Sequence, residues 1–211
     1  MKHSKIAMIG ILLSFTLVVS GAAVGQEIEN LVTNPDFEVG TEGWTLGSIA
    51  DGAAGQLMID KKEKGIVGDV MMAKIDGVGN DAWEPEIHSS SFAVKLGDTM
   101  TVSFWAKTEP GVTRTLGVVF EQLDTWQGTG TTFVLNDKWT EYHQSPKMVV
   151  SSPPNVIIHI QFNFMKEDVW FSHFRVYKGD WIEEKGLGEK PKLSIAPAGK
   201  LAVAWGQVKS R

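Results

Sequence analysis

Hydrophobic and polar residues alternate along most of the chain in short runs, which is the pattern expected of β-strands with one buried face. The longest such run spans residues 155–164. Every second residue in it is apolar and would face a core: Val156, Ile158, Ile160, Phe162 and Phe164. The opposite face carries Ile157, His159, Gln161 and Asn163. Because three of these four side chains are polar, this face can give and accept hydrogen bonds.

Similar alternation predicts further strands at residues 99–107, 113–123, 131–135, 139–144 and 169–177. Residues 90–96 and the Gly97-Asp98 turn precede the first of these strands, so we expect a β-hairpin there. Other turn-forming pairs, such as Asn34-Pro35 and Asp51-Gly52, separate the remaining runs. Helical periodicity is scarce. The pattern therefore predicts an all-β fold, a two-sheet antiparallel β-sandwich.

The first 25 residues have the features of a bacterial-type signal peptide. Lys2 and Lys5 precede an apolar run over residues 6–19, and Ala23 and Gly25 fit a cleavage point before Gln26. The apolar run is shorter than the roughly 20 residues that a membrane-spanning helix needs. We therefore expect residues 1–25 to be removed. The mature protein would then be secreted, periplasmic or at the cell surface, with no membrane span.

The composition changes after Tyr177. Residues 179–200 are rich in Lys, Glu, Gly and Pro, which is typical of a linker or an extended surface segment. A short apolar patch follows, made of Leu201, Val203, Trp205 and Val208. We therefore expect one domain over residues 27–180, and a linker with an apolar tail over residues 181–211. The tail is a candidate contact for a protein partner.

The composition also excludes several kinds of chemistry. The 211 residues include 20 basic and 25 acidic side chains, a net charge of −5, so no nucleic-acid partner is expected. There is no cysteine, which excludes disulfides, thiolate metal sites and a cysteine nucleophile. Tryptophan is abundant, with 8 Trp against 2 Tyr. So many indoles raise the question of whether some of them bind a ligand.

A set of motifs in a fixed order resembles a known family. The set comprises NLVTNPDFE at residues 30–38, a following Gly43-Trp44, VSFWAK at 102–107, DKWTEY at 137–142 and VWFSHFRVY at 169–177. In this order they are similar to the carbohydrate-binding modules that accompany bacterial xylanases, cellulases and related glycan-degrading enzymes. The resemblance covers nearly all of residues 27–180. It implies a jelly roll of the galactose-binding-like type, with sugar bound on a concave sheet or at loops on one rim.

A sugar ring has an apolar face of C–H groups and an edge of hydroxyls, so its site needs an exposed aromatic plane beside hydrogen-bonding side chains. Trp83 follows a Gly-rich loop and precedes a strand, where an indole can remain exposed. In related modules a Trp followed closely by an amide or acid lies in the ligand cleft, which implies Trp83 and Glu86. His88 shares the Glu86 face of an extended segment. The alternative is a buried Trp83 beside solvated carboxylates.

Two more sets of residues are candidates for the same site. His159, Gln161 and Asn163 can read sugar hydroxyls, although an ordinary solvent-facing sheet surface explains their pattern nearly as well. Trp126 lies in a polar loop with no obvious core to join. It is either an aromatic at the rim of the site or a cap on the end of the sandwich.

The resemblance also implies a structural calcium ion, held by an acid of the opening motif and an acid of the last strand. Glu38 matches the first position, and carboxylate oxygens suit calcium. The last strand carries Ser172-His173 where the second acid is expected, so one carboxylate ligand is missing. Glu38 is therefore the one candidate side chain for a structural calcium ion. The alternative is that Glu38 is an exposed surface acid, and no other cofactor is expected.

These features predict an exported, non-catalytic domain that binds a polysaccharide or glycoconjugate. Glu84 and Glu86 would place two carboxyl groups roughly 6–7 Å apart on an extended strand, close to the separation in inverting glycosidases. The Glu-x-Asp-x-x-Glu arrangement of retaining sandwich glucanases is absent, as are Gly-x-Ser-x-Gly and His-Glu-x-x-His. We therefore expect no catalysis. The alternative function is a structural or adhesive surface domain that makes protein–protein contacts and has no sugar ligand.

Overall fold

The computed structural model describes residues 28–187, so the predicted signal peptide and the apolar tail around Trp205 lie outside the described residues. Within the described range no helix has the length and apolarity needed to cross a membrane. The strands are β1 (Trp44–Gly47), β2 (Ala54–Ile59), β3 (Met71–Gly77), β4 (Glu86–Ser89), β5 (Phe92–Val94), β6 (Met100–Thr108), β7 (Arg114–Gln122), β8 (Gly128–Leu135), β9 (Thr140–Gln144), β10 (Ser152–Gln161) and β11 (Val169–Lys178).

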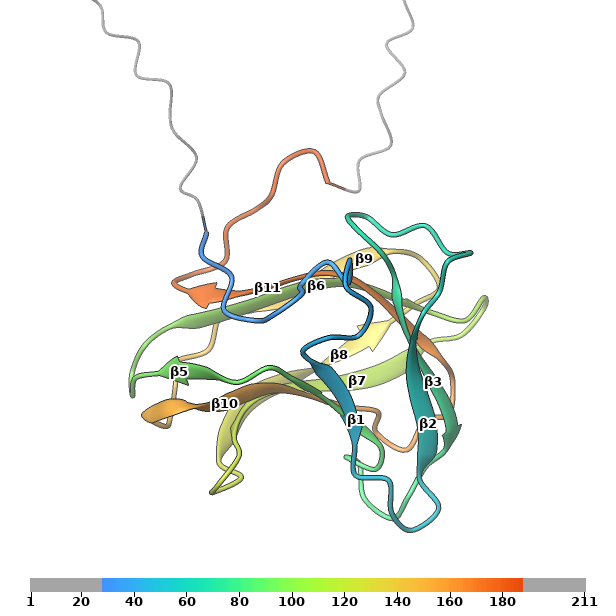
Figure 1. The fold of residues 1–211 in the computed structure, drawn as a ribbon, viewed down its shortest axis with the longest axis horizontal. Helices are drawn as coiled ribbons and strands as arrows, with labels where there is room; N and C mark the ends of the chain where they lie inside the picture. Colours follow the sequence, from blue (N-terminus) through green and yellow to red (C-terminus); the bar gives the residue numbers. More distant parts are fainter. Residues whose placement is uncertain (1–27, 188–211) are drawn as a thin grey trace, which may run out of the picture.

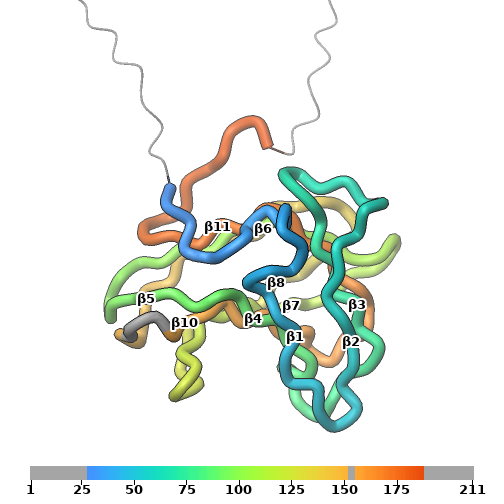
Figure 2. Tube along the Cα trace, in the orientation of Figure 1, coloured from blue at the N-terminus to red at the C-terminus, as the bar shows by residue number. Residues whose placement is uncertain are grey.

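The strands form two antiparallel sheets that pack face to face. One sheet has the order β1-β4-β10-β7-β8, with β5 also paired to β10, and the other has the order β2-β3-β11-β6-β9. Figure 1 shows β6 and β11 above β7 and β10. Figure 2 shows β4 lying between β1 and β10. The predicted two-sheet sandwich is confirmed.

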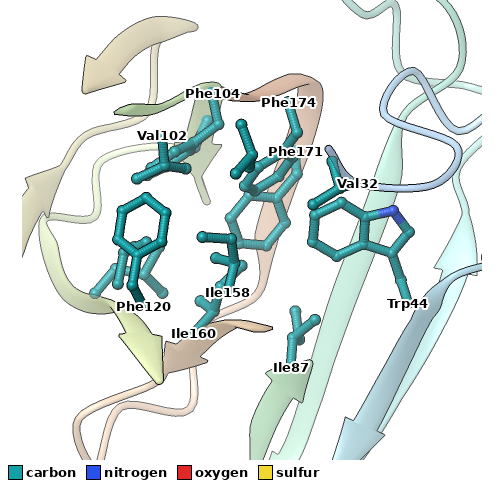
Figure 3. Packing of buried hydrophobic residues seen from close by; sticks show 14 of the residues in the cluster. Val32, Trp44, Ile87, Val102, Phe104, Phe120, Ile158, Ile160, Phe171 and Phe174 are labelled. Atoms are coloured by element: carbon teal, nitrogen blue, oxygen red, sulfur yellow. The ribbon is translucent and has the colours of Figure 1, made fainter. Parts of the chain in front are cut away.

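The core lies between the sheets and is rich in aromatic rings. Alternation along β10 works as the sequence predicts, because Val156, Ile158 and Ile160 are fully buried. Figure 3 shows the last two of these side chains directed toward Phe104 and Phe171 of the other sheet. The rings of Phe104 and Phe174 stack with their centroids 5.0 Å apart. Such aromatic pairs contribute to stability beyond the apolar area that they bury.

Two local expectations differ from the structure. Residues 90–96 and 99–107 do not form a hairpin, because β5 pairs with β10 while β6 pairs with β9 and β11 in the other sheet. The turn at Gly97 exists, but it carries the chain from one sheet to the other. Phe164 lies beyond the end of β10, has a positive φ of 62° and is 55% exposed, so it does not face the core.

A β-bulge in β11 changes which residues face the core. The pairing with β6 shifts register between Ser172 and Arg175, and His173 adopts a positive φ of 53°. A bulge inserts one extra residue and reverses the alternation beyond it. As a result Phe171 and Phe174, three residues apart, are both fully buried. The bulge also directs the His173 imidazole to Asp36, whose Oδ1 lies 2.6 Å from Nδ1.

The segment after β11 packs against the sandwich as far as Glu184. The Trp181 ring stacks on His143 with the two centroids 4.1 Å apart. Glu184 Oε2 lies 2.8 Å from His173 Nε2 and 3.3 Å from Arg175 Nη1. His173 is therefore held between an acid of the opening loop and an acid of the C-terminal segment.

Candidate functional site

A cavity of about 530 Å³ opens on the outer face of the six-stranded sheet. This face is opposite the core, because the cavity residue His159 alternates along β10 with Ile158 and Ile160. The connections β1–β2 and β7–β8 both project on this side of the molecule, downward in Figure 1. We call this hollow the Trp83–Trp126 cavity. Its lining residues are Ser48, Trp83, Glu86, Glu121, Trp126, His159 and Gln161.

Two exposed indoles stand at the cavity. Trp83, just before β4, is 44% exposed, and Trp126, in the β7–β8 connection, is 64% exposed. Trp126 has a positive φ of 57°, an unusual conformation for a large side chain. The loop is held by hydrogen bonds from the N–H of Trp126 to the carbonyl of Gln122 (2.8 Å) and from the N–H of Gln122 to the carbonyl of Gln127 (2.9 Å). These backbone bonds hold the loop that carries this indole.

The floor of the cavity is a cluster of charged and polar side chains from three neighbouring strands. His159 of β10 lies between two carboxylates, because its Nδ1 is 2.5 Å from Glu121 Oε2 of β7 and its Nε2 contacts Glu86 Oε2 of β4. The Ser48 hydroxyl donates to Glu86 Oε1 at 2.5 Å. His159 and Glu86 are both almost fully buried. Their charges are consequently screened little by water.

These contacts shift two pKa values in opposite directions. Burial disfavours the charged form of Glu86, but the contacts with His159, His88 and Ser48 outweigh it and lower the pKa of Glu86 to about 2. Burial likewise disfavours a charged His159, and the flanking Glu121 and Glu86 outweigh it and raise the pKa of His159 to about 9. At neutral pH the floor of the cavity therefore carries a charged carboxylate beside a charged imidazolium.

The structure brings most of the predicted site residues together. Trp83, Glu86, Trp126, His159 and Gln161 all line the cavity. His88 lies beside it on β4, with its Nε2 2.9 Å from Glu86 Oε1 and its ring edge-on to His159.

Asn163 does not line the cavity. Strand β10 ends at Gln161, so the alternation that would have aligned Asn163 with His159 is lost. Asn163 has a positive φ of 53°, and its N–H donates to the Ala82 carbonyl at 3.0 Å. This bond ties the end of β10 to the residue before Trp83.

Two lining residues, Ser48 and Glu121, are absent from the sequence-based candidates. Glu121 does carry a sequence signal, because it follows the apolar Phe120 in a predicted strand and therefore faces away from the core. Ser48 follows β1 in a region where no strand was predicted. Nothing in its local sequence distinguishes it from other surface serines.

The described residues do not assemble a cluster of calcium ligands around Glu38. Glu38 is exposed and, among residues 28–187, joins no group of three or more His, Asp or Glu side chains that could hold a metal ion. Ser172 is fully buried, and its hydroxyl donates to the Val67 carbonyl at 2.9 Å. The neighbouring His173 approaches Asp36 with a nitrogen, which is not a ligand that calcium prefers. Calcium binding through Glu38 stays a prediction.

The fold and the cavity define a β-sandwich of the carbohydrate-binding class. A protein-family model described as a carbohydrate binding domain, CBM_4_9, matches residues 29–164. The match covers more than half of the chain, so the protein belongs to this family, and the resemblance given by its sequence motifs is confirmed. It is a sugar-binding domain. No curated protein sequence matches the chain significantly.

Solved structures of carbohydrate-binding modules share the fold. A CBM4 structure has a TM-score of 0.53 and 16% identity, with 70% of this chain and 99% of that chain covered. The CBM22-1 xylan-binding domain of Paenibacillus barcinonensis Xyn10C has a TM-score of 0.51 and 14% identity, with 70% and 93% covered. The N-terminal cellulose-binding domain of Cellulomonas fimi β-1,4-glucanase C has a TM-score of 0.51 and 13% identity, with 73% and 100% covered. At these identities the likeness concerns the fold alone.

Proposed function

We propose that this protein is an exported, non-catalytic domain that binds a polysaccharide or glycoconjugate in the Trp83–Trp126 cavity. One observation carries the proposal: two exposed indoles and a row of hydrogen-bonding side chains converge on one hollow. The indoles offer apolar planes for the C–H faces of sugar rings. Gln161, Glu86 and Glu121 offer acceptors for hydroxyls, and the Gln161 amide also donates.

The geometry of the cavity favours weak but selective binding. Glu86 and Glu121 both contact His159, so the three side chains are held in place before a ligand arrives and little conformational entropy is lost on binding. The site is open and its aromatic groups lie at the surface, so the area removed from water is limited. We expect dissociation constants on the order of mM to 10 μM, about −4 to −7 kcal/mol.

The position of Glu84 supports a non-catalytic role. Its Oε2 accepts hydrogen bonds from the N–H groups of Asn80 (2.8 Å) and Asp81 (3.2 Å), so it stabilises the turn before β4. Glu84 is also absent from the cavity lining, and it therefore cannot pair with Glu86 across a bound glycan. The two acids that do flank the cavity, Glu86 and Glu121, both contact His159.

A glycan array with the mature protein tests the proposal most broadly. Affinity electrophoresis in gels that contain xylan, soluble β-glucan or a soluble cellulose derivative then gives the dissociation constant for each polymer. Retardation by at least one glycan is expected. Absence of retention on the array, combined with assembly in light scattering that depends on residues 186–211, would favour the alternative of a protein-binding surface domain.

A further inference from the structure

The floor of the Trp83–Trp126 cavity contains three potential metal ligands from two adjacent strands. Glu86, His88 and His159 each offer one ligand atom, and these atoms lie within 4.8 Å of one another. Strands β4 and β10 produce this arrangement because His88 and His159 are directly paired across the two strands. We call these three residues the Glu86–His88–His159 cluster.

The two imidazoles each turn a buried nitrogen toward the Glu86 carboxylate. Nε2 of His88 and Nε2 of His159 are both buried, and neither makes a hydrogen bond within the described part of the chain. Each of them lies against the Glu86 carboxylate, and the His88 contact is 2.9 Å long. Both contacts are ion-pair contacts, and neither counts as a well-formed hydrogen bond. Buried polar atoms without a partner are rare and call for an explanation.

The opposite nitrogen of His159 has the partner that metal-binding histidines typically have. Its Nδ1 lies 2.5 Å from Glu121 Oε2. In metal sites a carboxylate that accepts from one ring nitrogen fixes the imidazole and makes the other nitrogen a better ligand. Ser48 plays a similar part for Glu86, because its hydroxyl donates to Oε1 while Oε2 is the oxygen that faces His159 Nε2.

The charges at this position also suit a dication. Glu86 and Glu121 bring two carboxylates to one almost buried place, and His159 can contribute only one positive charge between them. A divalent ion that replaces the Nε2 proton of His159 and is held by Glu86 would balance both carboxylates. Its donor set, two imidazole nitrogens and one carboxylate oxygen, is typical of zinc and is disfavoured by calcium.

From this geometry we propose that Glu86, His88 and His159 bind one divalent transition-metal ion, for which zinc is the natural probe, on the floor of the Trp83–Trp126 cavity. Tetrahedral zinc with bonds of about 2.0–2.1 Å needs ligand atoms about 3.3 Å apart, so small side-chain rotations complete the site. Three protein ligands leave a fourth position, which faces the cavity and takes water or another oxygen donor from it. This site goes beyond sugar binding and does not require it.

The proposal is tested by calorimetry. Zinc is titrated into the full chain, which has first been stripped of metal and contains no glycan. One zinc ion per chain is expected, and His88→Gln is expected to weaken zinc binding at least tenfold. His143→Gln is the matched control, because His143 is exposed and stacks on Trp181 on the other sheet. Equal zinc binding by the His88→Gln variant and the wild type, or no saturable binding, would overturn the proposal. Calcium in excess should leave the zinc titration unchanged, and competition by calcium would contradict the nitrogen ligands.

X-ray absorption at the zinc edge of the wild-type complex does not depend on the folding of any variant. It should show two imidazole ligands with Zn–N distances of about 2.0–2.1 Å, and a shell of oxygen atoms alone would refute the site. Glycan retention measured in the presence of a chelator reports on the proposed function separately. Retention of glycan without any zinc binding would disprove only the metal site.

Discussion

Replacing Trp83 with alanine removes one of the two indoles at the cavity. The indole presents about 250 Å² in all, of which the 44% exposed fraction is about 110 Å². A sugar ring that covers half to all of this area removes about 55–110 Å² from water, equivalent to about 1.4–2.8 kcal/mol. Trp83→Ala should therefore raise the dissociation constant about tenfold to a hundredfold.

Affinity electrophoresis against the best ligand from the glycan array measures this change, with calorimetry for short oligosaccharides. Trp139→Ala is the matched control. Trp139 precedes β9 in the other sheet, where its Nε1–H donates to Glu63 Oε1 at 3.2 Å and its ring faces Lys107. The control should bind glycan like the wild type.

Trp83 is not part of the core cluster, so Trp83→Ala should keep a cooperative thermal transition. An unchanged dissociation constant in the folded Trp83→Ala variant would refute the stacking argument. If Trp139→Ala weakened glycan binding equally, the location of the site would be refuted, because the two indoles adjoin different sheets.

Three further changes test other parts of the structure. Gln161→Ala should weaken glycan binding by about 0.5–1.5 kcal/mol in calorimetry, the contribution of one hydrogen bond; an unchanged affinity would exclude this amide from the site. Phe104→Ala should lower the free energy of unfolding by about 3–5 kcal/mol in urea titrations, because the ring is fully buried; a loss below about 1 kcal/mol would contradict its central place in the core. His173 has a raised pKa, because the contacts with Asp36 and Glu184 outweigh burial. Its contribution to stability is therefore complete below the ordinary value of 6.5 and is lost as the pH rises through the raised value. The difference in thermal stability between wild type and His173→Asn should shrink over that range, and a constant difference would contradict this linkage.

Much of the strand pattern was predictable from the sequence because burial on one face is a local property. Alternation placed β6, β7, β10 and β11 within a few residues of their observed bounds. It also separated the core-facing Ile158 and Ile160 from the outward-facing His159. A two-residue period requires no knowledge of which strand lies beside which.

Pairing between strands was not predictable in the same way. The expected hairpin at Gly97 is absent because β5 and β6 each have better partners in opposite sheets, and a turn signal alone does not identify a strand's neighbour. The bulge at His173 likewise reverses the alternation of β11, which a strict two-residue period cannot anticipate.

The sequence by itself determined that one strand face carries His159 and Gln161. It also placed Trp126 in a polar loop, and Trp83 between a Gly-rich loop and a strand. Only the tertiary structure decided that these residues share a cavity with Glu86 and Glu121. The physical reason is the sheet order: β10 lies between β4 and β7, so one imidazole contacts carboxylates that are 35 residues apart in the chain, from position 86 to position 121. Contacts between residues so distant in sequence arise when the sheet forms, and no local pattern records them.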